Sequence, residues 1–517
     1  MKFALSLTAL VLSATLFGAA LSSSDAQNND AKISHVSADA VLTPQQVARD
    51  LTLAKEAFSR VHPGYTRYAS AEEMTLAWDS IQAQADANSG MALGDFYLAV
   101  NGALTNIRCD HTKAELPRSM RKQREGEPLY LPFRWEWIEG RALVESAAPG
   151  VSVQRGDEIL TIDGRPIGEI VDAVSQYIPV DGYTEWSRRS GISQSLEFMG
   201  GGVDHFGALL WDIPAKAQLT VLSADGGERD VTMDRVSFSD WSKLGRKSEA
   251  NFKDAVTYRT LADGVGYLSV DTFVNYREPV KPKTLFQPLF KQMREQGLET
   301  LILDLRRNGG GSGDAQYELL ANLIDRPYKP MKEMRAKTLD LDGIRPYLWT
   351  WDSRALDPNP IGFSKNDDGT YALRRFVSSD LKTVKPAKFA FDGKLIVLTS
   401  DTNSSGSTNM SAWLKELDRA IMVGEKTGGS AEGVTAGLQF TLTLPESGVR
   451  MRLPFFFMRN NVSSFEKGMG ITPNVFAPMT VNAFRENRDP ALEMAQSIAQ
   501  GQRNSVTVHQ LRESAPP

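Results

Sequence analysis

A turn of small and polar residues, 401–406, offers the clearest candidate for chemistry in this chain. It follows an apolar run, 395–398, which is typical of a strand buried on both faces of a sheet, and a helix is expected directly after it. A serine in such a turn would lie at a helix N-terminus, whose amides favour developing negative charge. The turn therefore indicates a nucleophile, although Ser404, Ser405 and Ser407 are also typical of turns and helix caps.

A glycine-rich run, 308–313, is the second candidate element. It follows an expected strand over 298–305 and precedes an expected helix over 315–324, so its amides could bind an anion. It is not a phosphate loop, because no Gly-Lys-Ser or Gly-Lys-Thr follows and the GxGxxG spacing is missing. The remaining interpretations are a second set of amides for an oxyanion and a plain turn into a helix.

A nucleophilic serine needs a general base, and the chain contains five histidines. His35 lies in a polar leader and His509 in a polar tail, so neither is expected to be held in place. His62 lies at an expected helix end, where packing or capping is its expected role, and His205 lies in a glycine-rich stretch. His111 lies in a polar turn after a helix and is the best candidate base, although single histidines also serve structure.

The elements that must position these residues predict an α/β fold. Strands that alternate with helices favour an open sheet, whose sites lie beyond the carboxyl ends of the strands. The glycine run and the serine turn both follow such ends. The long connection over 325–391 contains Trp349, Trp351 and several prolines, which favours a lid or insertion rather than core. The expected strands of this part cover 265–273, 298–305, 394–399 and 420–424.

Two modules precede the α/β part. Apolar residues at helical spacing predict a small helical domain with helices over 43–61, 71–87 and 93–106. Short β patterns begin at 129 and include strands over 143–146 and 158–162, a helix over 168–177 and a hairpin over 218–233. The stretch 181–214 inside this module is longer than a tight loop.

Five stretches, in chain order, resemble the S41 family of serine peptidases, which comprises the C-terminal processing and tricorn-type enzymes. They are RCDHT (108–112), RGDEILTIDG (155–164), DLRRNGGG (304–311), SSGSTNMSAWLKELDRAIMVGEKTGG (404–429) and FEKGMGITPNV (465–475). The second of these resembles a PDZ-like domain. The resemblance implies an α/β, crotonase-like catalytic core joined to a helical domain and a PDZ-like domain. Residue composition and the resemblance together predict these boundaries: a signal peptide (1–26), a disordered leader (27–42), the helical domain (43–125), the PDZ-like domain (126–236, insertion 181–214), the core (250–500, insertion 326–391) and a polar tail (501–517).

The resemblance also implies the nucleophile and the oxyanion hole. In the family's order the nucleophile falls on Ser405, with Gly406 and Gly310 or Gly311 supplying amides to the oxyanion.

The general base and the acid are assigned from the point at which this sequence departs from the family's serine-lysine pattern. The catalytic lysine of the serine-lysine members falls on Ser430 here, and Lys426 lies four residues earlier. Members without this lysine use histidine and glutamate, and the corresponding residues are His111 and Glu466, which complete a triad with Ser405. The alternatives that stay open are Asp110 and Glu432 as the acid, Ser404 and Ser407 as the nucleophile, and Lys426 as the base.

Composition and the first residues limit where the protein is expected to work and what it is expected to bind. Lys2, an apolar run over 3–21 and small residues after it predict a secretory signal peptide, so the mature protein is expected in the periplasm or outside the cell, without a membrane-spanning segment. The net charge of −5 gives no reason to expect nucleic acid as a partner. Cys109 is the single cysteine, which excludes an intrachain disulfide and a thiolate-rich metal site, and we expect no cofactor or metal.

The sequence therefore predicts a serine endopeptidase that hydrolyses peptides or unfolded proteins and captures them by strand addition to the PDZ-like domain. A non-catalytic binder of peptides or apolar ligands on the same scaffold is the alternative from another class, because fold does not fix function. A peptidase with a Ser405–Lys426 dyad is the alternative mechanism.

Overall fold

The computed structural model of the protein describes residues 36–195, 198–245 and 251–501. The predicted signal peptide, most of the predicted leader and the tail beyond residue 501 lie outside these ranges. The leader prediction is wrong for its last two residues, which form strand β1 (Val41–Leu42) and pair with β2 (Met91–Ala92). Within the described ranges, every helix is too short or too polar to be a membrane span.

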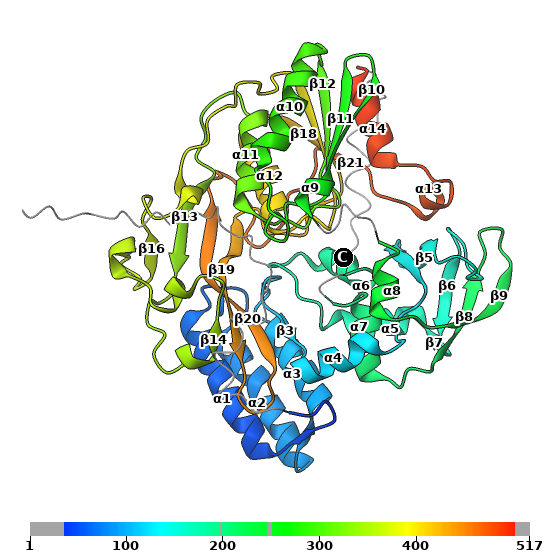
Figure 1. Cartoon of the computed structure of the whole chain (residues 1–517), viewed down its shortest axis with the longest axis vertical. Helices are drawn as coiled ribbons and strands as arrows, with labels where there is room; N and C mark the ends of the chain where they lie inside the picture. Colours follow the sequence, from blue (N-terminus) through cyan, green and yellow to red (C-terminus); the bar gives the residue numbers. More distant parts are fainter. Residues whose placement is uncertain (1–35, 196–197, 246–250, 502–517) are drawn as a thin grey trace, which may run out of the picture.

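Three helices form the first part of the chain, at the bottom of Figure 1: α1 (Pro44–Val61), α2 (Ala71–Ala87) and α3 (Leu93–Thr105). Thr43 and Ser70 begin α1 and α2 with reciprocal capping boxes, in which each hydroxyl accepts from the amide three residues later. The apolar faces of the helices meet around the fully buried Phe58, Trp78 and Phe96. The chain then makes the turn that contains His111 and continues into β3 (Ala114–Glu115) and α4 (Arg118–Gly126).

A β-rich part follows, at the right of Figure 1, with strand order β4-β5-β6-β8-β9 and β7 paired to β6. Helix α5 (Ile167–Ser175) buries Ile170 and Val174, and α8 (Phe238–Ser242) follows the last strand. The predicted insertion contains a 3₁₀ turn (Glu185–Ser187) and helices α6 (Arg188–Ile192) and α7 (Gly202–Leu210). The strands are β4 (Phe133–Ile138), β5 (Arg141–Ala147), β6 (Glu158–Ile162), β7 (Arg165–Pro166), β8 (Lys216–Leu222) and β9 (Glu228–Asp234).

The third part contains a six-stranded sheet with the order β10-β11-β12-β17-β18-β21, parallel except for β10. Its strands bury side chains on both faces, because helices cover both. Ile302 and Ile396 pack with α14, whereas Leu303 and Val397 belong to the main core cluster on the other face. The strands are β10 (Val256–Ala262), β11 (Val265–Val270), β12 (Thr300–Asp304), β17 (Lys394–Thr399), β18 (Ala420–Gly424) and β21 (Val475–Phe476); the helices are α9 (Phe252–Ala255), α10 (Pro282–Glu295), α11 (Gly313–Leu323), α12 (Ser405–Glu416), α13 (Val481–Arg485) and α14 (Pro490–Ala499).

A second, antiparallel sheet was not predicted from the sequence. Its centre is the hairpin of β19 (Gly433–Thr443) and β20 (Arg450–Asn460), and β3 pairs with β20 directly after the His111 turn. The connection over 325–391 supplies four strands to this sheet, and Met331, Ala336 and Leu348 are buried in it, so the prediction that this connection lies outside the core is wrong. These strands are β13 (Met331–Ala336), β14 (Leu348–Trp349), β15 (Phe363–Lys365) and β16 (Tyr371–Leu373).

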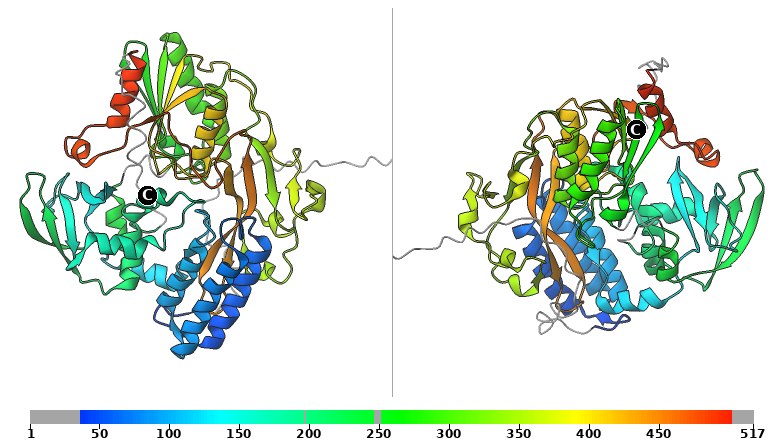
Figure 2. Two further views of the ribbon diagram at one scale, coloured as in Figure 1. Left: turned by 180° about the vertical axis from the view of Figure 1, so that it is seen from behind. Right: turned by 45° about the horizontal axis from the view of Figure 1, so that its top comes forward.

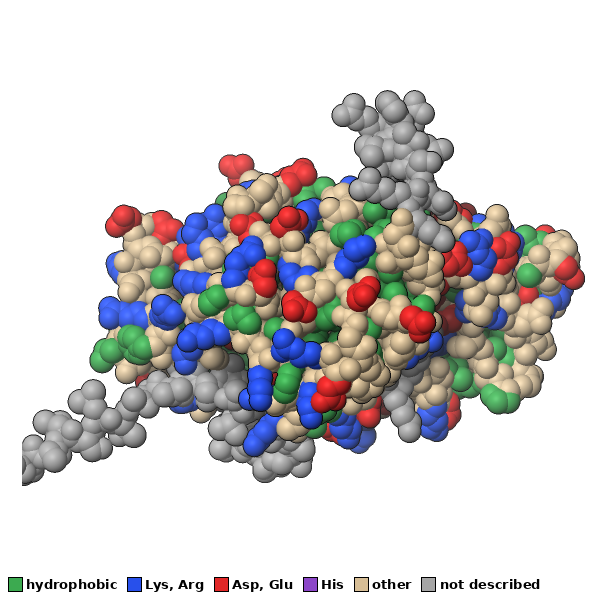
Figure 3. Space-filling model, turned by 90° about the horizontal axis from the view of Figure 1, so that it is seen from above, with side chains coloured by type: hydrophobic (Ala, Val, Ile, Leu, Met, Phe, Trp, Pro, Cys, Tyr) green, Lys and Arg blue, Asp and Glu red, His purple; other side chains and the backbone are tan. Residues whose placement is uncertain are grey.

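The predicted fold class is confirmed: the chain combines a helical part, a β-rich part and an α/β part. The three parts are grouped around the middle of the molecule, and the β19–β20 hairpin extends from the α/β sheet to the N-terminal helices (Figure 2). On the face shown in Figure 3, acidic and basic side chains are interspersed. Segments that are hundreds of residues apart in the sequence can therefore meet near the centre.

Candidate active site

Ser405 lies where strand β17 gives way to helix α12, at the carboxyl edge of the parallel sheet. Its φ of +47° is a left-handed backbone conformation, which is unfavourable for a residue with a side chain. Ser404 precedes the helix, and both serines are partly exposed. The sharp turn therefore lies at the strand end where a nucleophile is expected.

The glycine run packs directly against this turn. A side chain on Gly310 would place its Cβ 2.8 Å from the Cβ of Ser405, and one on Gly406 would place it 2.1 Å from a side-chain nitrogen of α11. The Gly310 amide donates to Oδ1 of Asn308 at 2.8 Å, so it is already engaged. Among the described residues, the amides of Gly311 and Gly406 donate to no protein acceptor, so these two are the pair available to an oxyanion.

Asn403 joins the serine turn to the glycine loop, and sequence analysis missed it. Its buried side-chain nitrogen donates to the backbone oxygens of Leu305 and Asn308, and its Oδ1 accepts from the amide of Ser400 at 2.8 Å. A buried amide with satisfied donors and acceptor fixes the relative position of the two segments. Asparagine is also a common turn residue, so its presence in the sequence does not by itself indicate this role.

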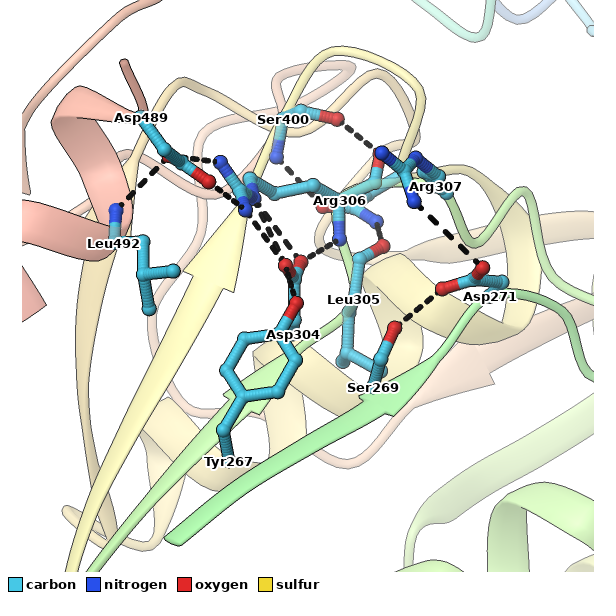
Figure 4. A network of polar contacts seen from close by, with 11 residues as sticks. Tyr267, Ser269, Asp271, Asp304, Leu305, Arg306, Arg307, Ser400, Asp489 and Leu492 are labelled. Carbon is cyan, nitrogen blue, oxygen red and sulfur yellow. Dashed lines mark hydrogen bonds and ion pairs between the residues drawn. The ribbon is translucent and has the colours of Figure 1, made fainter. Parts of the chain in front are cut away.

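An ion-pair network holds the start of the glycine loop (Figure 4). Arg306 lies between two carboxylates, Asp304 at the end of β12 and Asp489 at the start of α14, with N–O distances of 2.7 Å to each. Tyr267 donates its hydroxyl to Asp304 at 2.7 Å, and the Ser400 hydroxyl donates to the Arg306 carbonyl at 2.5 Å. The network therefore ties the glycine loop to two strands, a helix and the serine turn.

The candidate base lies on the turn between α3 and β3. His111 Nδ1 is 2.5 Å from Asp110 Oδ1, and the two side chains are 17% and 21% exposed. The other oxygen of Asp110 accepts from the hydroxyl of Ser404, 294 residues later in the chain. Burial alone would lower the pKa of His111, but the Asp110 carboxylate raises it well above its ordinary value of 6.5. The structure thus joins the histidine turn to the serine turn.

The hydroxyl of Ser405 itself makes no hydrogen bond with any residue that the structure describes. Ser404, and not Ser405, contacts the Asp110–His111 pair. Unliganded active sites often have long or missing catalytic hydrogen bonds that form only with substrate.

Two of the three candidate acids lie elsewhere. Glu466 is exposed, and its side chain forms no ion pair or hydrogen bond in the described part of the chain. Glu432 is buried in an ion pair with Arg67. Asp110 is therefore the carboxylate that contacts His111 here, whereas the predicted Glu466 does not contact it, because matching a motif along the chain does not report which way a side chain points.

The alternative base and one alternative nucleophile are also placed outside the site. Lys426 is exposed, its ammonium lies 5.2 Å from the centre of the Trp186 ring, and it does not line the cleft that contains the site. The Ser407 hydroxyl is buried and donates to the Asn308 carbonyl. Its role is therefore to hold the glycine loop.

Asp181 is a buried acid near His111 that the sequence did not indicate. Its Oδ2 accepts from the amide of Ser430 at 2.8 Å. Burial, and then the negative charge of Asp110, raise the pKa of Asp181 to about 7. Asp181 comes from the insertion in the β-rich part, so a third segment of the chain reaches the site.

Two further histidines are buried in structural contacts, a role that the sequence predicts for His62. His62 is buried with its Nε2 2.9 Å from the Thr112 hydroxyl, and burial lowers its pKa to about 3. His205 is buried with its Nε2 2.9 Å from the Tyr97 hydroxyl. His62 therefore supports the turn that holds His111.

One group of side chains has the spacing of a metal site. Ligand atoms of Cys109, Asp110 and His111 lie within 4.8 Å of one another. Asp110 is paired with His111 and Ser404, and Cys109 donates to the Thr435 carbonyl at 3.5 Å. These contacts with the protein already engage the group, and we assign no metal to it.

A cleft of about 3560 Å³ contains the site. Its walls come from the helical, β-rich and α/β parts, and His111, Ser405 and Gly311 all line it. An extended polypeptide fits a cleft of this size more readily than a small ligand does.

Family models match two stretches of the chain. Residues 264–476 match the model of peptidase family S41, and residues 127–241 match that of a PDZ domain. The α/β core is an S41 peptidase domain. The predicted resemblance to the S41 family is thus confirmed, and the matching core is that of a serine-type peptidase. The S41 match includes Ser405 and the glycine loop, whereas His111 lies outside both matches.

Solved structures resemble the S41 chain over most of its length. Mature CPAF complexed with lactacystin aligns with a TM-score of 0.62 at 16% identity, over 88% of this chain and 97% of that chain. Mature CPAF aligns with a TM-score of 0.60 at 16% identity, over 90% of this chain and 99% of that chain. These identities establish a shared fold alone. No curated protein sequence matches the chain.

Proposed function

We propose that this S41 protein is a serine endopeptidase that hydrolyses peptide bonds of peptides and unfolded proteins. The observation that carries the proposal is the contact between Ser404 and Asp110, which brings the histidine turn to the serine turn of the S41 domain. The large cleft supports a polypeptide substrate. The PDZ domain would hold part of that substrate by strand addition.

In the proposed mechanism, Ser405 Oγ attacks the scissile carbonyl while His111 accepts its proton and later delivers it to the leaving amine. The amides of Gly311 and Gly406 stabilise the oxyanion. Asp110, held against His111 Nδ1, stabilises the imidazolium. Substrate binding must bring the Ser405 hydroxyl and the imidazole together, because the two are not hydrogen-bonded without it.

Labelling with a biotinylated alkyl fluorophosphonate tests the proposal. We expect a stoichiometric adduct whose peptide map places it on Ser405, and labelling should compete with hydrolysis of an unfolded protein substrate. An adduct on Ser404 would assign the nucleophile to Ser404 instead of Ser405. The absence of any adduct, with unfolded protein still bound, would favour a non-catalytic peptide binder on the S41 scaffold, a function that the missing Ser405–His111 bond allows.

The charge of Asp110 is expected to set the pH dependence of hydrolysis. A histidine base must be unprotonated to accept a proton, so kcat/KM should rise with pH and reach half its maximum above pH 6.5. In Asp110→Asn the carboxylate no longer offsets the effect of burial, which lowers the pKa of His111. The half-maximum should therefore move below pH 6.5. The maximal kcat should also fall by about 10²-fold to 10⁴-fold, because the imidazolium loses its carboxylate. Both effects are measured in one pH–rate profile with a peptide substrate.

Glu466→Gln is the matched control for this prediction, because it removes the carboxylate that the family's order favours. We expect it to retain both the pH profile and most of the rate, since Glu466 is exposed and does not contact His111. A large loss of kcat in Glu466→Gln, together with a normal kcat in Asp110→Asn, would assign the acid to Glu466 instead of Asp110.

We also propose that the protein works in the periplasm or outside the cell. The charged start and the apolar run over 3–21 support this location. Comparing the mass of the N-terminal peptide of the exported protein with that of the full sequence tests it, and an uncut, cytoplasmic product would contradict it.

A further inference from the structure

The turn that carries His111 begins with a strained residue. Arg108 has a φ of +55°, in the left-handed region that is unfavourable for a side chain with a Cβ. Such a conformation persists where the surroundings hold it, and it is common at functional turns. Only Cys109 and Asp110 lie between Arg108 and the proposed base, so any change in the backbone of Arg108 is passed to His111.

Residues 181–185, which we call the bridging segment, hold Arg108 in this conformation. The Gly182 amide donates to the Arg108 carbonyl at 2.9 Å. The Arg108 guanidinium donates to the Gly182 carbonyl at 3.1 Å and to Glu185 Oε1 at 2.6 Å. It also lies 5.3 Å from the centre of the Tyr183 ring. The backbone and the side chain of Arg108 are thus fixed by the same short segment.

The opposite side of the bridging segment is anchored to the S41 domain. The Thr184 hydroxyl donates to the Gly428 carbonyl at 2.7 Å, and Asp181 accepts from the Ser430 amide at 2.8 Å. The Tyr183 amide donates to the Gly468 carbonyl at 2.7 Å. The bridging segment therefore spans from the histidine turn to loops of the catalytic core.

Gly182 shows how tightly the bridging segment is packed. Its φ is +64°, and a Cβ added to it would lie 2.4 Å from the Gly468 carbonyl oxygen. A larger residue at this position would have to push the segment away from the core.

The bridging segment belongs to the stretch that matches a PDZ domain, whereas the serine turn belongs to the S41 match. We propose that Arg108 is a positioning residue, and that its contacts with Gly182 and Glu185 hold the turn of His111 in the position from which substrate binding can bring the imidazole to Ser405. This inference rests on the proposed function. Neither Arg108 nor residues 181–185 line the cleft, so they act on the base and not on the substrate.

Two variants separate the contact from the backbone strain. Arg108→Asn keeps a residue type that tolerates the left-handed conformation but is too short to reach Glu185. Glu185→Gln keeps the size of the side chain but removes the charge that Arg108 binds. We expect kcat to fall by about 10-fold to 100-fold in Arg108→Asn and less in Glu185→Gln, with KM within about twofold, because a misplaced base slows the chemical step. Arg108→Lys should recover part of the loss.

Glu56→Gln is the matched control, because Arg60 and Glu56 form an ion pair of similar length and exposure on α1, far from the site in the chain. It should behave as the wild type in kcat, KM and melting temperature. A charge reversal, Arg108→Glu with Glu185→Arg, should regain activity relative to Arg108→Glu alone.

The positioning role is overturned by a kcat of Arg108→Asn equal to that of Glu56→Gln, or by a change confined to KM. Failure of the proposed function looks different, because the wild type would then show no hydrolysis, or hydrolysis would survive Ser405→Ala. A melting temperature that falls in Arg108→Asn without any change in kcat would leave a purely structural contact, which also overturns the proposal.

Discussion

Ser405→Ala is expected to lower kcat for hydrolysis of an unfolded protein by about 10⁶-fold while the chain stays folded. The loss is this large because the nucleophile, the base and the oxyanion donors act as a unit, and the remaining rate comes from the amides of Gly311 and Gly406 alone. The variant keeps the Cβ and removes only a hydroxyl that makes no hydrogen bond with any described residue, so its melting temperature should change little. Titration with the fluorophosphonate should then give no adduct.

Ser404→Ala is the matched control, since it removes the neighbouring hydroxyl from the same turn. Its hydroxyl donates to Asp110, so we expect a modest loss through a less well-held His111 turn and full labelling of Ser405. An inactive Ser404→Ala variant together with an active Ser405→Ala variant would assign the nucleophile to Ser404 and contradict the assignment to Ser405.

Elements with local signals were predictable from the sequence. Apolar residues at helical spacing predicted α1 and α2, and α2 begins and ends where the sequence predicts. The short apolar run at Ala420–Gly424 likewise gave β18 with the observed bounds. These features depend on residues within one or two turns of each other, so pattern alone suffices.

Elements that depend on distant pairing were not predictable. The long hairpin of β19 and β20 contains Gly433, Gly437 and Pro454, which locally indicate turns, and it has a bulge between Ala436 and Gln439. Its strands are fixed by pairing with β3, β13 and β14, which lie more than 80 residues earlier in the chain. Tertiary contacts of this kind override local preference.

The site was predictable in its residue types but not in its contacts. The order of the motifs placed the serine turn, the glycine loop and His111 in one active site, and the structure brings these segments to one cleft. Two contacts depend on the direction in which side chains point within turns. They are the hydrogen bond from the Gly310 amide to Asn308 and the contact of Asp110 with His111. Motif spacing carries no information on either.

His111→Ala is expected to reduce kcat about as much as Ser405→Ala does, because the serine cannot be deprotonated without its base. The single-turnover acylation rate, measured with an activated ester substrate, should fall in the same way. Added imidazole should restore part of the rate in His111→Ala and none in Ser405→Ala, since a diffusible base can enter a cleft of about 3560 Å³. Rescue of this kind distinguishes a missing base from a misfolded site.

Lys426→Ala is the control that separates this mechanism from a serine-lysine dyad. Lys426 is exposed beside Trp186 and does not line the cleft, so its loss should change kcat by less than about threefold. An active His111→Ala enzyme with an inactive Lys426→Ala enzyme would require the loop over 425–430 to refold and bring the lysine to Ser405. The contacts of Thr184 and Asp181 with this loop oppose such a movement, which is why the histidine mechanism fits the structure better.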